Sequence, residues 1–135
     1  MTMRAHPGVP SRIISRLRSI SLSLPETHEE TAWVGVRWRI RTKTFVHVLM
    51  IDGGWPPAYA RAAGTDGPAC VLTFRSPMPA VDNEAFHKPP FFKPVWWPDI
   101  AGMILGSHVD WREVSTLITV SYRMLAPKKL AERMR

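Results

Sequence analysis

The sequence predicts an α+β fold, a two-layer sandwich in which helices lie on one side of an antiparallel sheet. Apolar residues alternate with arginines over residues 34–41, which is typical of a strand with one buried face. A second apolar strand follows after a tight turn, and two strands joined so closely form an antiparallel hairpin. The expected order is one helix, three strands, a short helix, one or two strands and a final helix.

The first helix is expected to begin with Ser11 as its cap and to run to about residue 24, where Pro25 ends it. Residues 1–10 hold two prolines and a glycine and are expected to be a flexible lead. Residues 26–31, which carry three acids, are expected to be a loop. The apolar stripe of the helix consists of Ile13, Leu17, Ile20 and Leu24.

The middle of the chain is expected to hold the strands. The hairpin strands span residues 33–41 and 44–51, with the turn near Thr42 and Lys43. The proline-rich segment 88–98 is either an irregular loop or an edge strand, because proline cannot donate to a central ladder. The other expected elements are a helical turn at 59–63, a strand at 69–74, a short helix at 80–86 and a strand at 100–105.

The last helix has the clearest start signal. Asp110 is followed three residues later by Glu113, which is a capping arrangement. A basic helical segment is expected at 128–134, after Pro127. Residues 11–135 are predicted to form a single domain, because this length fits one domain with a real core.

Composition favours an anionic partner. The net charge is +7 and the pI is about 10.3, which is typical of proteins that contact nucleic acid or an anionic surface, although an inert basic domain has the same composition. Six tryptophans predict large buried aromatic surfaces or an aromatic groove. No stretch approaches the apolar length of a membrane span, and the basic N-terminus lacks the pattern of a signal peptide. We therefore expect no membrane partner.

The single cysteine, Cys70, excludes an internal disulfide and lies in an apolar run. We expect a buried, inert thiol and a cytoplasmic location.

The strongest functional candidate is a row of cations on the first hairpin strand. Arg37, Arg39 and Arg41 project from one face at a spacing of about 6.5–7 Å, close to the phosphate spacing along a nucleic-acid strand. Arginine also binds phosphate in a bidentate manner. In the alternative interpretation, the acids of residues 26–30 or a neighbouring strand pair with these arginines. The full set of expected nucleic-acid contacts is Arg37, Arg39, Arg41, Lys43, Arg123, Lys128 and Lys129.

No pattern indicates catalysis, a metal or a cofactor. The five histidines lack the short spacings of a zinc site, and there is no second cysteine. The pairs Ser107-His108 and Ser121-Tyr122 lack a visible base and orienting acid. No glycine pattern resembles a phosphate-binding loop. His47 is most simply a half-buried strand residue with a hydrogen-bond partner. We expect no enzyme activity, no metal and no cofactor.

An aromatic set near the C-terminal third has two interpretations. It can stack bases, as in single-strand binders, or it can pack as core under a proline-rich crossover. We favour the core. The set comprises Phe91, Phe92, Trp96 and Trp97.

The C-terminal part of the chain resembles the C-terminal part of the MmcQ/YjbR-like family. There, a capped helix of the type seen at residues 110–114 ends in a Ser-Tyr pair, here Ser121 and Tyr122, followed by apolar residues and a basic tail. The N-terminal half is similar to the family in the order of its features. These are Leu24-Pro25, the acids, Trp33, the hairpin with Lys43 before Phe45, and Trp96 or Trp97 before the final strand.

The resemblance spans about residues 11–131, and this chain departs from it at Thr42, where a glycine is frequent, and in the proline-rich 77–98 region. It implies a curved antiparallel sheet similar to CyaY-like or secretion-chaperone-like folds. It also implies a DNA-binding protein whose hairpins act as wings. From this we expect weak, largely sequence-nonspecific contact with DNA phosphates. The alternative is a protein-interaction or chaperone-like module, or self-association, through an aromatic-rich sheet face.

Overall fold

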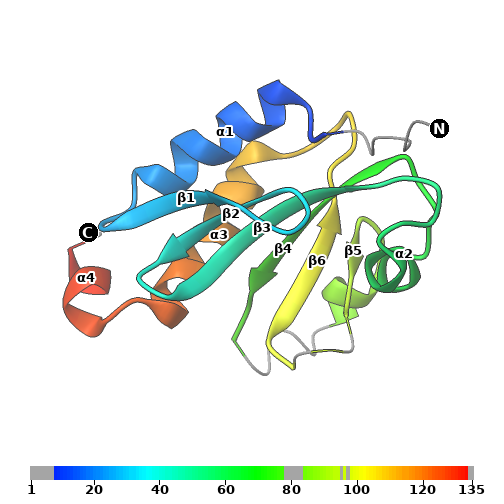
Figure 1. Ribbon diagram of the computed structural model, residues 1–135. Coiled ribbons are helices and arrows are strands. Elements are labelled where there is room, and N and C mark those ends of the chain that lie inside the picture. The colour runs from blue at the N-terminus through cyan, green and yellow to red at the C-terminus, as the bar shows by residue number, and fades with distance from the viewer. Residues whose placement is uncertain (1–7, 78–83, 95, 97, 134–135) are drawn as a thin grey trace.

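Six strands form one open antiparallel sheet in the order β1-β2-β3-β4-β6-β5 (Figure 1). The structure is a computed structural model that describes residues 8–77, 84–94, 96 and 98–133. The strands are β1 (Thr27–Thr31), β2 (Val36–Ile40), β3 (Lys43–Ile51), β4 (Ala69–Arg75), β5 (Phe91–Phe92) and β6 (Ile100–Ile104).

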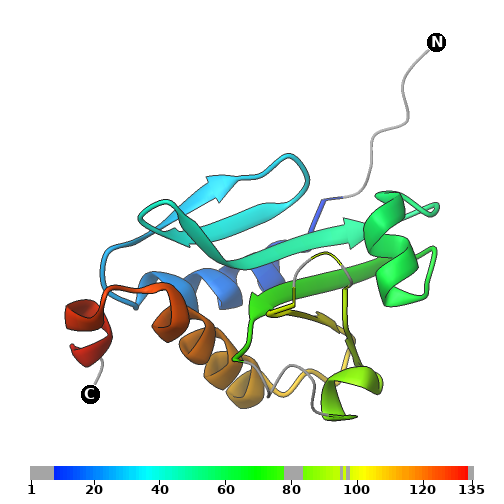
Figure 2. The ribbon, with the colours of Figure 1, turned by 90° about the horizontal axis from the view of Figure 1, so that it is seen from below.

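Two long helices, α1 (Ser11–Leu22) and α3 (Trp111–Leu125), lie together on one face of this sheet (Figure 2). This confirms the predicted α+β sandwich. The shorter helical elements are α2 (Pro57–Ala63), the 3-10 turn η2 (Glu84–His87) and α4 (Lys128–Glu132). None of the helices described is long and apolar enough to cross a bilayer.

The main core lies between the sheet and the two long helices. Every second residue of the central strands points into it, as a period of two requires. In β3 and β4 these are cross-strand pairs such as Val48 with Leu72, and in β2 the fully buried Trp38. The helices contribute Leu17, Ile118 and Tyr122, all with no exposed surface. Trp38 and Ile40 of β2 are thus buried as predicted, whereas Val36 is half-buried against the same core and Val34, before the strand, packs on the opposite face of the sheet.

The residues between these point to the other face of the sheet and form a second, smaller cluster. Leu49, Ile51 and Val71 are fully buried there against Ala60 of α2 and Phe92 of β5. The ring of Phe92 lies over Gly102, where an added Cβ would be only 2.3 Å from it, so this position needs glycine. Helix α2 and strand β5 cover only part of this second face, and the rest of it, beside α2, is open.

A β-bulge in β3 changes the side-chain phase near the hairpin turn. Trp38 pairs with Val46, but the next residue of β2, Arg39, pairs with Thr44. Phe45 therefore has no partner in β2, and its ring turns into the main core together with the side chain of Val46.

Ser121 of α3 hydrogen-bonds the backbone groups beside this irregularity. Its hydroxyl donates to the Phe45 carbonyl oxygen at 2.6 Å and accepts from the Arg75 backbone N–H at 2.8 Å. The neighbouring Tyr122 packs edge-on against Phe45 and donates its hydroxyl to the Pro25 carbonyl at 2.7 Å. The Ser-Tyr pair is thus a structural link between α3, the sheet and the α1–β1 connection.

The segment predicted to be an acidic loop is strand β1, so that prediction is wrong. Thr27 to Thr31 pair along the whole of β2, and a polar sequence suits a strand whose outer neighbour is solvent. The predicted Ser11 cap is also wrong. Pro10 occupies the cap position and no side chain caps the helix. Helix α1 ends at Leu22, two residues earlier than expected.

Other sequence predictions are confirmed. Asp110 caps α3 by accepting from the backbone N–H groups of Arg112 and Glu113. Of the two interpretations of the proline-rich segment, the edge strand holds for β5, at the end of the sheet. The expected helix at 80–86 falls largely on residues outside those described.

Candidate functional site

The arginine row on β2 is paired with the neighbouring strand. Arg37 donates from Nε and Nη2 to one oxygen of Glu30, at 3.1 and 2.7 Å, and Arg39 donates from Nη1 to the other at 3.1 Å. Hydrogen bonds from these two guanidiniums lower the pKa of Glu30 to about 2, so the carboxylate stays charged. Of the two interpretations left open by the sequence, the paired one describes Arg37 and Arg39.

Arg41 lies beyond the strand, in the turn between β2 and β3, with φ at 55°. Its side chain is 60% exposed and approaches Glu26 only to 3.7 Å. Lys43, the first residue of β3, is exposed. The cations of the turn are therefore presented to solvent, in contrast to those of the strand.

The turn and the C-terminal helix lie at the same end of the molecule (Figures 1 and 2). Glu26 links them, because its carboxylate is 3.7 Å from Arg41 and 3.9 Å from Arg133. We call this region the basic end. Its described members are the exposed cations Arg41, Lys43, Arg123, Lys128, Lys129 and Arg133, with Glu26 and Glu132 as the acids among them.

The seven cations singled out from the sequence thus fall into two groups. Five of them, from Arg41 onward, gather at the basic end. Arg37 and Arg39 lie on the second face of the sheet and are held by Glu30. Two arginines of α1 have other partners: Arg18 is paired with Glu29 at 2.9 Å, and Arg16 lies over the ring of Trp111 on the helical face.

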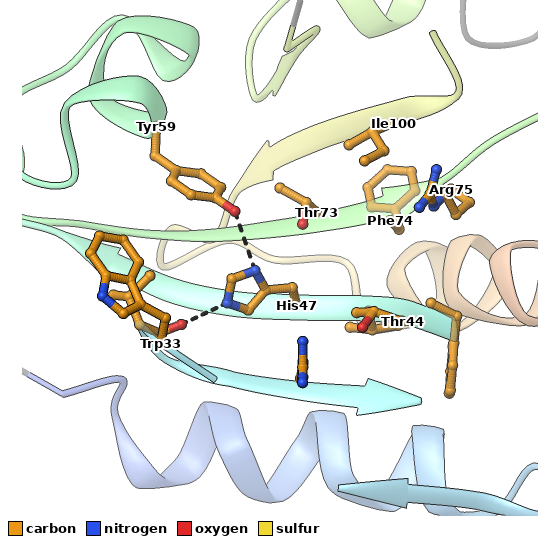
Figure 3. A pocket seen from close by; sticks show the side chains of 12 residues that line it. Trp33, Thr44, His47, Tyr59, Thr73, Phe74, Arg75 and Ile100 are labelled. Carbon is orange, nitrogen blue, oxygen red and sulfur yellow. Dashed lines mark hydrogen bonds between the residues drawn. The ribbon is translucent and has the colours of Figure 1, made fainter. Parts of the chain in front are cut away.

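A pocket of about 320 Å³ opens on the second face of the sheet, which we call the open-face pocket (Figure 3). Its floor is formed by β3 and β4, and its walls come from β2, β6, α2 and the β1–β2 loop. The lining includes Trp33, Arg37, His47, Tyr59, Thr73 and Arg75.

His47 lies at the centre of this pocket with both ring nitrogens engaged. Nε2 is 2.6 Å from the Val34 carbonyl oxygen, so it carries the proton, and Nδ1 accepts from the Tyr59 hydroxyl at 3.3 Å. Burial lowers the pKa of His47 below its ordinary value, and the positive charge of Arg37 adds to this shift. Burial raises the pKa of Tyr59. Both rings are therefore neutral at pH 7, and His47 has the predicted hydrogen-bond partner.

Aromatic rings form one rim of the pocket. Trp33 is 80% exposed and packs at a tilt against Trp55, with ring centroids 5.3 Å apart. Tyr59 meets Trp96 edge-on at 4.8 Å, and Trp96 is itself 37% exposed. At the opposite end of the pocket Arg75 donates to Asp99 at 2.8 Å.

Sequence reasoning did not find this pocket, because its lining comes from five elements whose proximity only the fold creates. One signal was present: His47 and Thr73, polar residues in otherwise apolar strands, are paired across β3 and β4.

The aromatic set near the C-terminal third is divided. Phe92 is buried in the second cluster and Phe91 packs against the main core through Phe86, as the core interpretation predicted. Trp96 is partly exposed and packs edge-on against Tyr59 of the pocket instead, and Trp97 lies outside the described residues. Cys70 is buried as expected, and burial raises the pKa of its thiol to about 12. Among the described residues, no three His, Cys, Asp or Glu side chains are grouped as metal ligands.

The fold and these surfaces define a small α+β domain with a cationic end and an open sheet face. The chain belongs to the YjbR family, whose model matches residues 22–124. The match runs from the end of α1 to the last turn of α3 and so includes Ser121 and Tyr122, but not α4. No curated protein and no solved structure matches the chain closely enough to add a relative.

Proposed function

We propose that this protein binds DNA weakly and with little sequence preference, through phosphate contacts at the basic end, and that it does so in the cytoplasm without enzymatic activity. The observation that carries the proposal is the gathering of exposed cations from the β2–β3 turn, the end of α3 and α4. Their carboxylate neighbour Glu26 is too distant and too exposed to neutralise them strongly.

Lysine and arginine contacts of this kind position a protein on a duplex but do not distinguish sequences. Each phosphate neutralised releases counterions, so affinity falls with salt at a slope of about −0.9 per contact on a log–log plot. The basic end offers several such contacts. The proposal therefore requires a steep salt dependence and similar affinities for unrelated sequences.

The test is a titration of a labelled DNA duplex over a salt series, measured by fluorescence anisotropy. In the triple variant Arg123→Ala, Lys128→Ala, Lys129→Ala we expect affinity at low salt to fall at least about tenfold and the salt slope to become shallower by about 3. The matched control is Arg12→Ala, Arg61→Ala, Arg112→Ala. It removes the same charge from exposed positions outside the basic end.

Equal losses in the two triple variants would mean that net charge alone drives binding, and the proposed interface would be wrong. A second pair of changes, Arg37→Ala with Arg39→Ala, separates the strand from the turn. Because Glu30 already pairs with both arginines, we expect this variant to lose much less affinity than the basic-end variant. A larger loss of DNA affinity in this variant would place the interface on the arginines of β2 instead of the basic end.

The alternative of a protein-interaction module finds support in one feature, the exposed ring of Trp33 beside Trp55. Exposed tryptophans are frequent at protein interfaces. Sedimentation of the full chain over a concentration series tests self-association. A dimer that the Trp33→Ala variant abolishes would favour this alternative, and a monomer at all concentrations would exclude self-association.

A further inference from the structure

We propose that the open-face pocket is a second binding site, which takes a small aromatic carboxylate: its carboxylate on Arg37 and its ring against Trp33. The proposal is independent of DNA binding, since it concerns another surface and other residues. It rests on the shape of the pocket, on its charge and on the exposed aromatic rim.

The pocket has the features of a ligand site. Its volume of about 320 Å³ is at the lower end of the range for small-molecule sites. Polar side chains from different elements converge in it. The hydroxyls of Thr73 and Tyr59 and the imidazole of His47 are seen in Figure 3, and the guanidinium of Arg37 also belongs to the lining. Fixed polar groups within an apolar lining are what orient a small ligand.

The charge of the pocket favours a monoanion. Arg37 and Arg39 share the single carboxylate of Glu30, while Arg75 is matched by Asp99. These groups together have one positive charge in excess. Arg37 gives only Nε and Nη2 to Glu30, which leaves its Nη1 group without a protein partner among the described residues. A carboxylate supplies one negative charge and acceptors for these donors, whereas a phosphate monoester brings nearly two charges.

The effect of Arg37 on its neighbours supports this assignment. Its positive charge contributes to the lowered pKa of His47, so the field of Arg37 reaches the centre of the pocket. The same field that disfavours a protonated imidazole there stabilises a bound anion.

The aromatic part of the ligand follows from the rim. Trp33 keeps most of its surface exposed although it lies beside Trp55 and borders the pocket. A planar ring placed against Trp33 would bury this surface, and offset or edge-on aromatic pairs are favourable beyond their buried area. A flat ring with one carboxylate therefore satisfies both ends of the site.

The test uses 2-naphthoate as the probe and the full chain as the protein, with binding followed by heteronuclear NMR. We expect the resonances of His47 and Thr73 to shift and the pKa of His47 to rise when the anion binds beside it. The uncharged 2-naphthylmethanol, with the same ring system, is expected to bind about tenfold more weakly because it lacks the ionic contact with Arg37.

Two variants and a matched control locate the contacts. Arg37→Gln and Trp33→Ala should each weaken 2-naphthoate binding, the first by about tenfold. Arg61→Gln is the control, because it also removes one guanidinium, from an exposed position that lies outside the pocket lining and is not paired with Glu30. It should keep the affinity within about twofold.

Equal binding of the charged and uncharged probes would overturn the proposal, as would shifts confined to residues outside the pocket. Equal losses for Arg37→Gln and Arg61→Gln would show a general charge effect and no site. None of these outcomes bears on DNA binding, which the basic-end variants test separately.

Discussion

Ser121 shows that one buried hydroxyl can connect three elements of the fold. It links α3 to the backbones of two strands, and its own surface is fully buried. Ser121→Ala leaves the Phe45 carbonyl and the Arg75 N–H without this partner, in a region that water does not reach. We expect the free energy of unfolding to fall by about 2–3 kcal/mol, measured by urea denaturation.

Ser115→Ala, on the same helix but only partly buried, is the control and should change stability by less than about 0.5 kcal/mol. If the two serine variants were equally stable, the bridging role of Ser121 would be wrong.

His47 gives stability a pH dependence. Burial is the main cause of its lowered pKa, so below the ordinary value of 6.5 the unfolded chain binds a proton more readily than the folded chain. The free energy of unfolding should therefore be highest above pH 6.5 and should fall as pH drops from 6.5 toward the folded-state pKa. Thermal unfolding at several pH values measures this slope.

His47→Gln should flatten the profile in this window, and His108→Gln, at an exposed position, should not. A second fall in the free energy of unfolding is expected between pH 4.5 and about pH 2. It comes from Glu30, whose pKa in the folded chain is about 2 instead of 4.5. A slope below pH 6.5 that persists unchanged in His47→Gln would contradict the assignment to His47.

At the scale of elements, β1 controls the charge of its neighbour. Glu30 on β1 holds both arginines of β2, so Glu30→Gln removes the carboxylate that neutralises these two guanidiniums on the second face of the sheet. We expect this variant to bind duplex DNA more tightly, with a salt slope steeper by about 1–2. Glu113→Gln, which removes the same charge from the first turn of α3, should have a smaller effect. Identical gains in the two variants would refute a local role for β1.

The two hairpin strands and α3 could be predicted from the sequence because their signals are local. Alternation buries Trp38 and Ile40, and Asp110 caps its own helix. Strand β1 could not be predicted, because its residues carry no apolar pattern and acquire their conformation by pairing with β2. The bulge at Phe45 was not predictable either. Its carbonyl oxygen accepts from the hydroxyl of Ser121 in α3, 76 residues later in the sequence.

At the scale of the whole molecule, α4 contributes to both stability and charge. It lies outside the family match, and Leu130, 4% exposed, holds it to the main core. A chain ending at Ala126 should still fold. Loss of the Leu130 contact is expected to cost about 2–3 kcal/mol, measured by urea denaturation, and the salt slope for DNA should become shallower by about 2. A truncated chain with unchanged affinity for DNA would exclude α4 from the interface.

The candidate site was predictable only in part. The basic residues were visible in the sequence, but which of them are neutralised depends on Glu29 and Glu30, whose partners only the fold reveals. The open-face pocket was not predictable, since Trp33, Tyr59 and Arg75 belong to a loop, a helix and a strand that only the fold brings together.

The Ser121-Tyr122 pair also has a consequence for the order of folding. Its partners are Pro25, Phe45 and Arg75, which precede it by 97, 76 and 46 residues. Contacts at such separations form late, because long loops must close first. During synthesis all three partners leave the ribosome before α3 exists. The second half of α3 therefore closes a sheet whose central strands are already available, and until it docks the nascent domain exposes the apolar face that α3 later covers.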